Sequence, residues 1–424
     1  MPPHPRAGII PKAGRAPATP RPEGMLVPHD RTQRRGPLRG ALTLLASALL
    51  ALLVANSPYG PLYRRLWRTP YHLGPWLVTT AQSVVDKGLM TLFFLLIGLE
   101  LRREVAHGAL RHMRAMLLPL WAAATGMLLP ALIYHLINPH GEAARGWAIP
   151  MSTDVAFAAA ALAVLGRRAP RSLLVLLLAL AVADDIGAIL VIALYYHHGL
   201  RPVPLAGALL AFAALFAAGR RGSRRPWLYG ILGGLLWGAL WRGGIDPPLA
   251  GVLLAVSLPA PGTTAPATGA PPASRLERRL APYVTYGALP LFALAHAGLS
   301  LAGPGVGISG GVFLGVFLGL LLGKFCGVGG GAWLATTLRF GALPGGVTRR
   351  HLGAAAWLAG IGFTMALFIA TLAFPPGPLR DAAKLAILTA SPLAFLAAAA
   401  WMWAGDRQAP AVSAAGGESA PRAP

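Results

Sequence analysis

The feature that most constrains this chain is an apolar segment with two adjacent carboxylates at its centre. Residues 173–196 read LLVLLLALAVADDIGAILVIALYY, which is longer than the roughly 20 apolar residues that cross a bilayer as a helix. Asp184 and Asp185 are its only charges, and an ionisable side chain at mid-membrane costs at least about 2.5 kcal/mol. We therefore expect the pair to face a cavity and bind an ion. The alternative is a pair that only caps or reorients a helix end.

The composition indicates a polytopic membrane protein. Hydrophobic residues make up 55% of the chain and charged residues 12%, whereas soluble domains carry about 25% charged residues. The net charge of +23 would suit a nucleic-acid partner, but the arginines lie in short connectors between apolar segments. The positive-inside rule places them there, so we expect the lipid bilayer, and not nucleic acid, as the partner.

Twelve apolar segments can be placed along the chain. They lie near residues 40–56, 76–101, 115–137, 148–165, 172–196, 203–219, 227–241, 247–258, 282–302, 309–338, 350–373 and 381–403. Arginines cluster in the connectors after even-numbered segments and are sparse after odd-numbered ones, except for Arg64, Arg65 and Arg68. This pattern predicts twelve spans in a bacterial inner membrane, with both termini cytoplasmic. If the first segment were a cleaved signal peptide, the count and the alternation would change.

The transmembrane domain is expected to cover residues 39–405. Residues 1–38 and 406–424 lack an apolar period and are rich in Pro, Arg, Gly or Ala, which predicts disordered cytoplasmic tails. Residues 259–273 are a run of Pro, Thr, Ala and Gly, which is typical of a flexible linker.

The fourth segment is expected to be a broken helix. Ser152, Thr153 and Asp154 follow Pro150, and such side chains compete with backbone hydrogen bonds and favour helix ends. Extended backbone at membrane depth is tolerated only where it is buried in protein or lines a cavity. Thr153 and Asp154 could then join the aspartates of segment five in an all-oxygen site, which suits alkali or alkaline-earth cations. An ordinary N-cap is the simpler explanation for Asp154.

A second break is expected in the eleventh segment, WLAGIGFTMALFIATLAF. Gly360 and Gly362 weaken the helix there, and Thr364 follows. STDVAFA and FTMALFI resemble each other, and each lies in the middle of three consecutive segments. Corresponding interruptions in two halves indicate inverted repeats with a binding site where they cross. Close helix packing alone would also explain Gly362.

Lys324 lies well inside the tenth segment, in LGLLLGKFCGVGGGAWLA. A carboxylate, Asp184 or Asp154, could hold it there, as could the negative ends of broken helices. Snorkelling to the interface is the alternative. A lysine that loses its proton when a cation arrives would couple the two ions.

Glu100 and Glu104 are expected near a cytoplasmic helix end. Basic side chains surround them: Arg102, Arg103, His107 and His112. The cluster is either a solvated group of charges or a pH-responsive entrance to the site.

Several stretches closely resemble the bacterial NhaA-type Na+/H+ antiporters. They are LFFLLIGLELRRE, GWAIPMSTDVAFA, LALAVADDIGAI, LPLFALAHAGLSL, LLLGK and GIGFTMALFIATLAF, and the similarity runs from about residue 40 to 403. The resemblance implies an all-α fold of twelve transmembrane helices, with inverted repeats in which discontinuous spans 4 and 11 cross. It also implies electrogenic, pH-regulated exchange of internal Na+ or Li+ for external H+, without a cofactor and for pH and sodium homeostasis.

The resemblance assigns roles to several residues by analogy. Asp185 and Asp184 would bind the cation and protons, with Thr153 and Asp154 at the crossing. Lys324 would balance the opposing helix ends. Asp86 would take a supporting position, and Glu100 would belong to the pH-responsive entrance.

Two departures from the family pattern bear on the pH profile. This chain has Asp246 where the family often has histidine, and His296 where it usually has asparagine. In addition, the Tyr59–Leu73 loop looks too basic and proline-containing to guarantee the family's dimerising hairpin, so a homodimer stays open.

Other classes fit the sequence less well. An intramembrane aspartyl protease would need aspartates on two helices in a GxGD-like setting, and a prenyl-transfer enzyme would need a DDxxD site; DDIGA offers neither. There is no P-loop motif. A passive channel stays open, as does K+ or Ca2+ as the principal ion.

Overall fold

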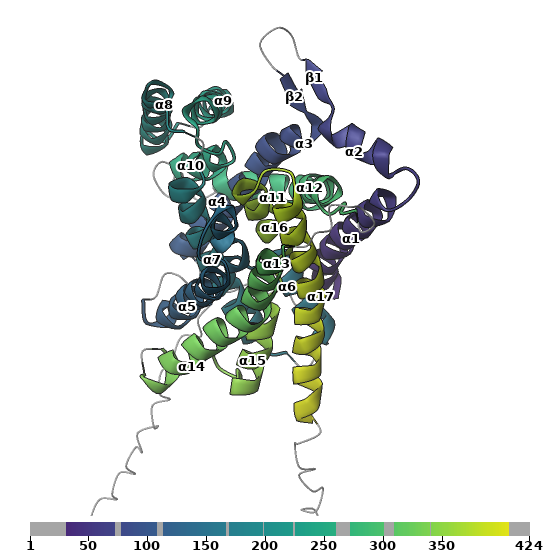
Figure 1. Ribbon diagram of the computed structural model, residues 1–424. Coiled ribbons are helices and arrows are strands. Elements are labelled where there is room, and N and C mark those ends of the chain that lie inside the picture. The colour runs from purple at the N-terminus through teal and green to yellow at the C-terminus, as the bar shows by residue number, and fades with distance from the viewer. Residues whose placement is uncertain are drawn as a thin grey trace, which may run out of the picture.

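The computed structural model describes most of the predicted transmembrane domain as helix (Figure 1). The described residues are 31–72, 78–107, 113–166, 169–197, 199–223, 225–259, 272–300, 309–339 and 341–406. Most of the predicted tails and of the linker lie outside them. The first helix begins at Arg31, inside the segment predicted as a tail.

Ten helical or strand elements precede the Asp184–Asp185 helix in the residues that the structure describes. They are α1 (Arg31–Ala55), α2 (Gly60–Arg68), β1 (Pro70–His72), β2 (Val78–Thr80), α3 (Ala81–Val84), a π-helical turn η1 (Val85–Leu89), α4 (Met90–His107), α5 (Met113–Ile137), a 3₁₀ segment η3 (Glu142–Met151) and α6 (Val155–Leu165). The helix with both aspartates follows as α7 (Arg171–Tyr195).

In the second half, every described secondary-structure element is a helix. It contains α8 (Pro202–Arg220), α9 (Pro226–Gly243), α10 (Leu249–Ser257), α11 (Pro272–Tyr283), η5 (Val284–Ala288), α12 (Leu289–His296), α13 (Gly310–Leu318), η6 (Gly319–Gly323), η7 (Phe325–Gly329), α14 (Gly330–Thr337), α15 (Arg349–Leu358), α16 (Phe363–Ala373) and α17 (Pro378–Asp406).

These helices make the chain a polytopic membrane protein. Six described helices are long and apolar enough to cross a bilayer, and two bent pairs, η3 with α6 and α15 with α16, pass the same criterion together. Each of the twelve predicted apolar regions contains a helix. The second region differs at its start, because residues 78–80 form strand β2 and the helix begins at Ala81.

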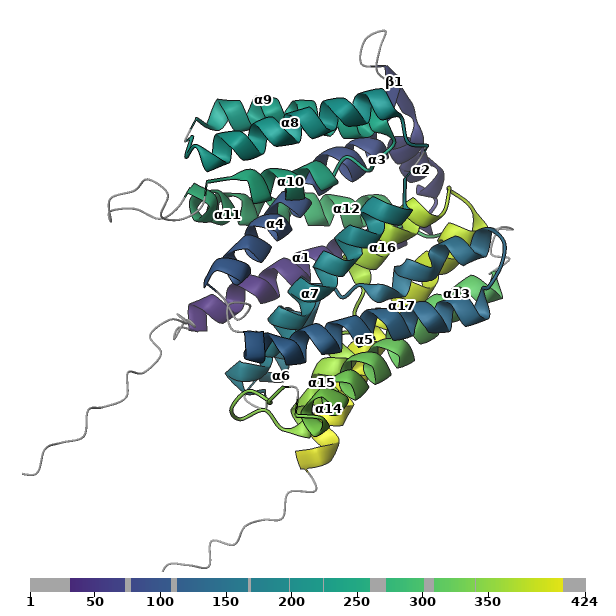
Figure 2. The same ribbon diagram turned by 90° about the vertical axis from the view of Figure 1, so that its left-hand side faces the viewer.

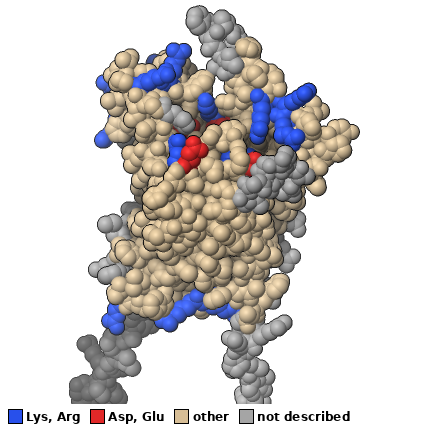
Figure 3. All heavy atoms as spheres, viewed as in Figure 1, with Lys and Arg blue, Asp and Glu red and all other residues tan. Residues whose placement is uncertain are grey.

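The arrangement has two distinct ends. Figure 2 shows the start of α1 and the end of α17 on the side opposite to β1 and α2. In Figure 3 the basic side chains gather toward the upper and lower ends of the view, with a broad uncharged surface between them. An uncharged belt is what a bilayer requires of the surface of a protein that spans it.

Small residues let the helices approach closely in the interior. A Cβ at Gly251 of α10 would overlap the backbone oxygen of Thr91 in α4, and a Cβ at Gly219 of α8 would overlap the backbone oxygen of Ser257. Helices in lipid gain little from the hydrophobic effect between them, so such close contacts matter for their association.

The loop after α2 does form a short hairpin. β1 and β2 pair antiparallel, with Pro70 opposite Thr80. Pro70 is the first residue of its strand, a position at which the missing N–H is tolerated. The basic, proline-containing sequence is therefore compatible with a hairpin. The hairpin by itself does not show that the protein forms a dimer.

Candidate ion-binding site

The two predicted breaks are present, and they contact each other. The η3–α6 pair bends by 43° at residues 152–154, and the α15–α16 pair bends by 42° at residues 359–362. The backbone N–H of Asp154 donates to the carbonyl of Ile361 at 2.6 Å. A Cβ at Gly362 would lie 3.2 Å from the carbonyl oxygen of Ser152, so glycine suits this crossing.

Asp154 joins the two breaks through its side chain. Its Oδ1 accepts from the N–H of Phe157 at 3.1 Å, which makes it the N-cap of α6. Its Oδ2 accepts from the backbone N–H and the hydroxyl of Thr364, at 3.0 and 2.5 Å. The simple N-cap explanation is therefore confirmed, and Thr364 is placed at the crossing. Because both oxygens already accept hydrogen bonds, Asp154 is less free than Asp185 to take an ion.

Asp184 points into the protein and pairs with Lys324. Both side chains are fully buried, and the Lys324 Nζ lies 2.5 Å from Asp184 Oδ2. The structure thus selects Asp184 between the two predicted partners and excludes snorkelling. Lys324 lies between two π-helical turns, η6 and η7, and such turns are frequent at functional sites.

Thr153 links Asp184 to the break in α15–α16. Its Oγ1 lies 2.6 Å from Asp184 Oδ2 and 2.9 Å from the carbonyl oxygen of Ala359. A hydroxyl carries one hydrogen and donates to one of these oxygens at a time. The hydrogen-bond pattern at Asp184 can therefore change without a change in the backbone.

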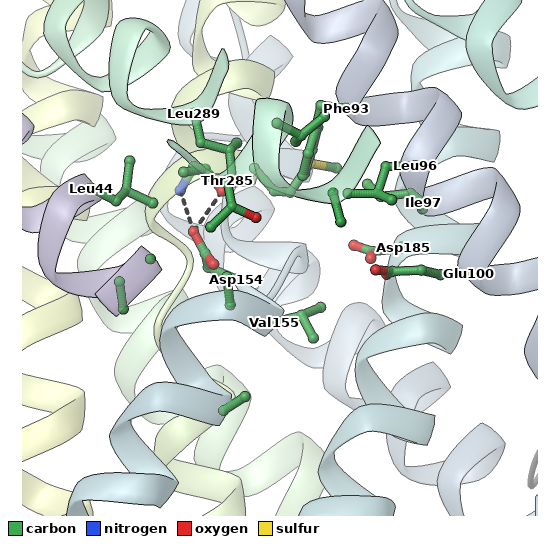
Figure 4. Close-up of a pocket in the computed structure, with 18 of the residues that line it drawn as sticks. Leu44, Phe93, Leu96, Ile97, Glu100, Asp154, Val155, Asp185, Thr285 and Leu289 are labelled. Carbon is green, nitrogen blue, oxygen red and sulfur yellow. Dashed lines mark hydrogen bonds between the residues drawn. The ribbon is translucent and has the colours of Figure 1, made fainter. Parts of the chain in front are cut away.

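Asp185, in contrast, faces a cavity. This cavity has a volume of about 470 Å³, and Asp185, Glu100, Thr153, Asp154 and Thr364 are among its lining residues. Figure 4 shows the Asp185 and Glu100 carboxyl groups side by side across from Asp154. Asp185 Oδ1 is buried and has no hydrogen-bond partner among the described residues. The adjacent aspartates thus point in different directions, as the 100° between successive helical residues predicts.

The cavity reaches a charged rim. Arg103 and Glu104 also line it, and Arg103 Nη1 lies 2.5 Å from Glu277 Oε1 on α11. Burial raises the pKa of Glu277, and the nearby Arg103 guanidinium opposes this shift. Glu100 and Glu104 both line the cavity, and whether they form a pH-responsive entrance stays a prediction; the side chains of His107 and His112 lie outside the described part.

Asp86 does not join this group. Its Oδ1 lies 2.5 Å from His296 Nε2, and it lines a second cavity of about 600 Å³ together with Lys87, Asp246 and Arg380. Sequence reasoning flagged Asp86 and His296 separately but missed the pair. The only available signal was that both are polar residues within apolar segments.

Buried carboxylates and a lysine beside two crossing helix breaks define a secondary ion transporter. The comparisons with known proteins give the family. The profile of the family described as Na+/H+ antiporter 1 matches residues 34–402, so the chain belongs to this family and is a transporter, not an enzyme.

Individual relatives are similar to this chain over most of its length. A protein of Syntrophobacter fumaroxidans is 40% identical over 419 residues, which cover 87% of this chain and 89% of the relative. A protein of Acidovorax sp. (strain JS42) is 43% identical, with 87% and 90% covered, and one of Pseudomonas putida (strain GB-1) is 44% identical, with 82% and 90% covered. All three are named Na(+)/H(+) antiporter NhaA.

Proposed function

We propose that this Na+/H+ antiporter exchanges cytoplasmic Na+ or Li+ for external H+ by alternating access, electrogenically and under pH control. One observation carries the proposal. Asp185 lines the cavity and its buried Oδ1 has no hydrogen-bond partner among the described residues, while Asp184 beside it is held at Oδ2 by Lys324 and Thr153. One carboxylate is thus open to an incoming ion, and the other is linked to a cation that the ion can replace.

Competition for the aspartates couples the two fluxes. A desolvated carboxylate is stable when protonated or paired with a cation, but not as an isolated charge. Na+ entering from the Glu100 side therefore takes the place of protons at Asp185. When Na+ also binds the Asp184 carboxylate, Lys324 loses its counter-charge and can release a proton. Thr153 supplies a further neutral oxygen, which suits an alkali cation.

The membrane topology belongs to the same proposal. Twelve spans, with the two triplets around η3–α6 and α15–α16 as inverted repeats, would place the crossing near mid-membrane. The arginine-rich connectors would face the cytoplasm of a bacterial cell, together with both termini. Support comes from the position of both described chain ends on one side (Figure 2).

The test is ion-driven proton movement in everted membrane vesicles from a bacterium without its own antiporters. A pH gradient made by respiration should collapse on addition of Na+ or Li+ with the wild type, and not with Asp185→Asn. Glu142→Gln, which neutralises an exposed carboxylate away from the cavity, is the matched control and should behave as wild type.

Two results would reject parts of the proposal. A full response from Asp185→Asn would move the ion site elsewhere. Voltage-driven Na+ current without proton counter-movement would identify a passive channel instead of an exchanger.

A further inference from the structure

The arginines that break the positive-inside pattern lie together on one short amphipathic helix. Helix α2 has the sequence GPLYRRLWR, and only four residues separate it from the end of α1. It therefore lies where the polypeptide leaves the membrane. In the topology proposed above this is the external side, where the positive-inside rule disfavours clustered arginines. A charge cluster in this position calls for a binding partner.

One face of α2 is attached to the protein. The Tyr63 hydroxyl donates to the carbonyl oxygen of Leu294 in α12, and Tyr63 packs edge-on against Trp67 at 6.4 Å between ring centroids. Tyr63 also fills the space beside Gly298. This face fixes the orientation of α2, so the remaining faces are presented to the surroundings in a defined way.

A second face is apolar and exposed. Leu62 and Leu66 are four residues apart and share one side of the helix, and they are 66% and 55% exposed. Tyr59, just before the helix, is 69% exposed. A short helix with exposed leucines beside an arginine-rich face is typical of helices that lie in the membrane interface.

The third face is basic. Arg64, Arg65 and Arg68 surround a shallow hollow of about 530 Å³, whose other lining residues are Pro61, Thr69 and Pro70. None of the three arginines forms an ion pair with a carboxylate in the part of the chain that the structure describes. Figure 3 shows basic side chains gathered at the upper right, where α2 lies in Figure 1.

We propose that α2 is an interfacial helix that binds the phosphate headgroup of an anionic phospholipid in the adjacent leaflet. Leu62 and Leu66 lie among the acyl chains, and Arg64, Arg65 and Arg68 hold the phosphate. Guanidinium groups bind phosphate oxygens with two parallel hydrogen bonds. Three of them around one hollow favour a headgroup with a net negative charge over a zwitterionic one, whose phosphate charge is balanced by its own cation. Because Tyr63 anchors α2 to α12, bound lipid would stabilise α1 and α12 against each other.

A site-specific fluorescence measurement tests this. The exposed Cys326 is replaced by serine, and Leu66→Cys is labelled with bimane in the full chain. The protein is placed in vesicles of phosphatidylcholine with about 30% phosphatidylglycerol, and bromine, which quenches bimane, is carried on one lipid or the other. Each arginine near a surface is expected to favour the anionic lipid roughly fivefold.

We expect brominated phosphatidylglycerol to quench the label more strongly than its share of the vesicle lipids would give. Even a tenfold preference would make roughly 80% of the lipids around the label phosphatidylglycerol. With Arg64→Gln, Arg65→Gln and Arg68→Gln together, each lipid should quench in proportion to its mole fraction. High salt should weaken the preference of the parent protein for the anionic lipid. The matched control replaces three arginines at the connector between α8 and α9, Arg220→Gln, Arg221→Gln and Arg225→Gln. This variant should leave quenching at Leu66→Cys unchanged.

Two outcomes would overturn the proposal. Quenching in proportion to composition in the parent protein would mean that α2 lies in the membrane without lipid preference. Weak quenching by both lipids would mean that α2 lies in water or is covered by a second copy of the chain. Retained Na+/H+ exchange by the triple arginine variant in the same vesicles shows that it is folded.

Discussion

Removal of the Lys324 side-chain charge tests how the buried ion pair stabilises the fold. Lys324 and Asp184 are both fully buried, and their charged atoms are 2.5 Å apart. Lys324→Met keeps a long apolar side chain but leaves Asp184 without its cation. Asp184 retains only the Thr153 hydroxyl, because its Oδ1 has no partner among the described residues.

The expected loss is large. Removing one partner of a buried ion pair costs about 3–5 kcal/mol, because a desolvated charge is left unpaired. For a chain of this size, that corresponds to a melting temperature lowered by roughly 3–6 °C. The double variant Lys324→Met with Asp184→Asn removes both charges, and it should recover most of the loss because neutral groups carry a much smaller desolvation penalty.

The assay is thermal unfolding of the purified protein in neutral detergent at constant pH and without added Na+. Lys384→Met is the matched control. Lys384 is the second buried lysine, and it forms no salt bridge within the described residues, so its replacement should cost less. A double variant as unstable as Lys324→Met would refute the reasoning, because the loss would then come from packing and not from the unpaired carboxylate.

Two further predictions concern other parts of the molecule. Gly219→Ala should cost about 1–3 kcal/mol of unfolding free energy and so lower the melting temperature, because the new Cβ would overlap the Ser257 carbonyl oxygen. Gly230→Ala, which has open space, should not, and equal losses would contradict the close-contact argument. Burial raises the pKa of Asp246, in the α9–α10 connector, to about 7, with Asp86 adding to this and Lys87 opposing it. Because the folded protein holds the Asp246 proton more tightly than the unfolded chain, protonation stabilises the fold. This contribution is fully present at a pH below the ordinary carboxyl pKa, and it is lost as the pH rises through about 7. The wild-type melting temperature should therefore fall more between weakly acid and weakly alkaline pH than that of Asp246→Asn, and parallel curves would contradict this assignment.

The sequence predicted the two helix breaks well because the local signals are strong. Pro150, Ser152 and Thr153 precede Asp154, and Gly360 and Gly362 precede Thr364. Such residues disfavour a continuous helix whatever surrounds them. Their mutual contact, through Asp154 and Thr364, followed only from the weak internal repeat.

Pairings between distant residues were much less accessible. Lys324 could be assigned a carboxylate partner, but the choice between Asp184 and Asp154 depended on which helix face each occupies. Asp86 and His296 are 210 residues apart, and nothing in either apolar segment indicates that they meet. One helix start also moved, to Ala81, because residues 78–80 form strand β2 and the Thr80 side chain caps the helix by accepting from the N–H of Ser83.

The sequence by itself therefore determined that the chain spans a membrane, where its helices break, and which carboxylates are too costly to bury without a function. These properties follow from hydrophobicity, backbone preference and the free energy of desolvation, which act within one segment. The tertiary structure alone decided that Asp184 pairs with Lys324, that Asp185 faces the cavity, and that α2 presents its arginines together. These depend on the relative rotation and packing of helices far apart in the chain, which no single segment encodes.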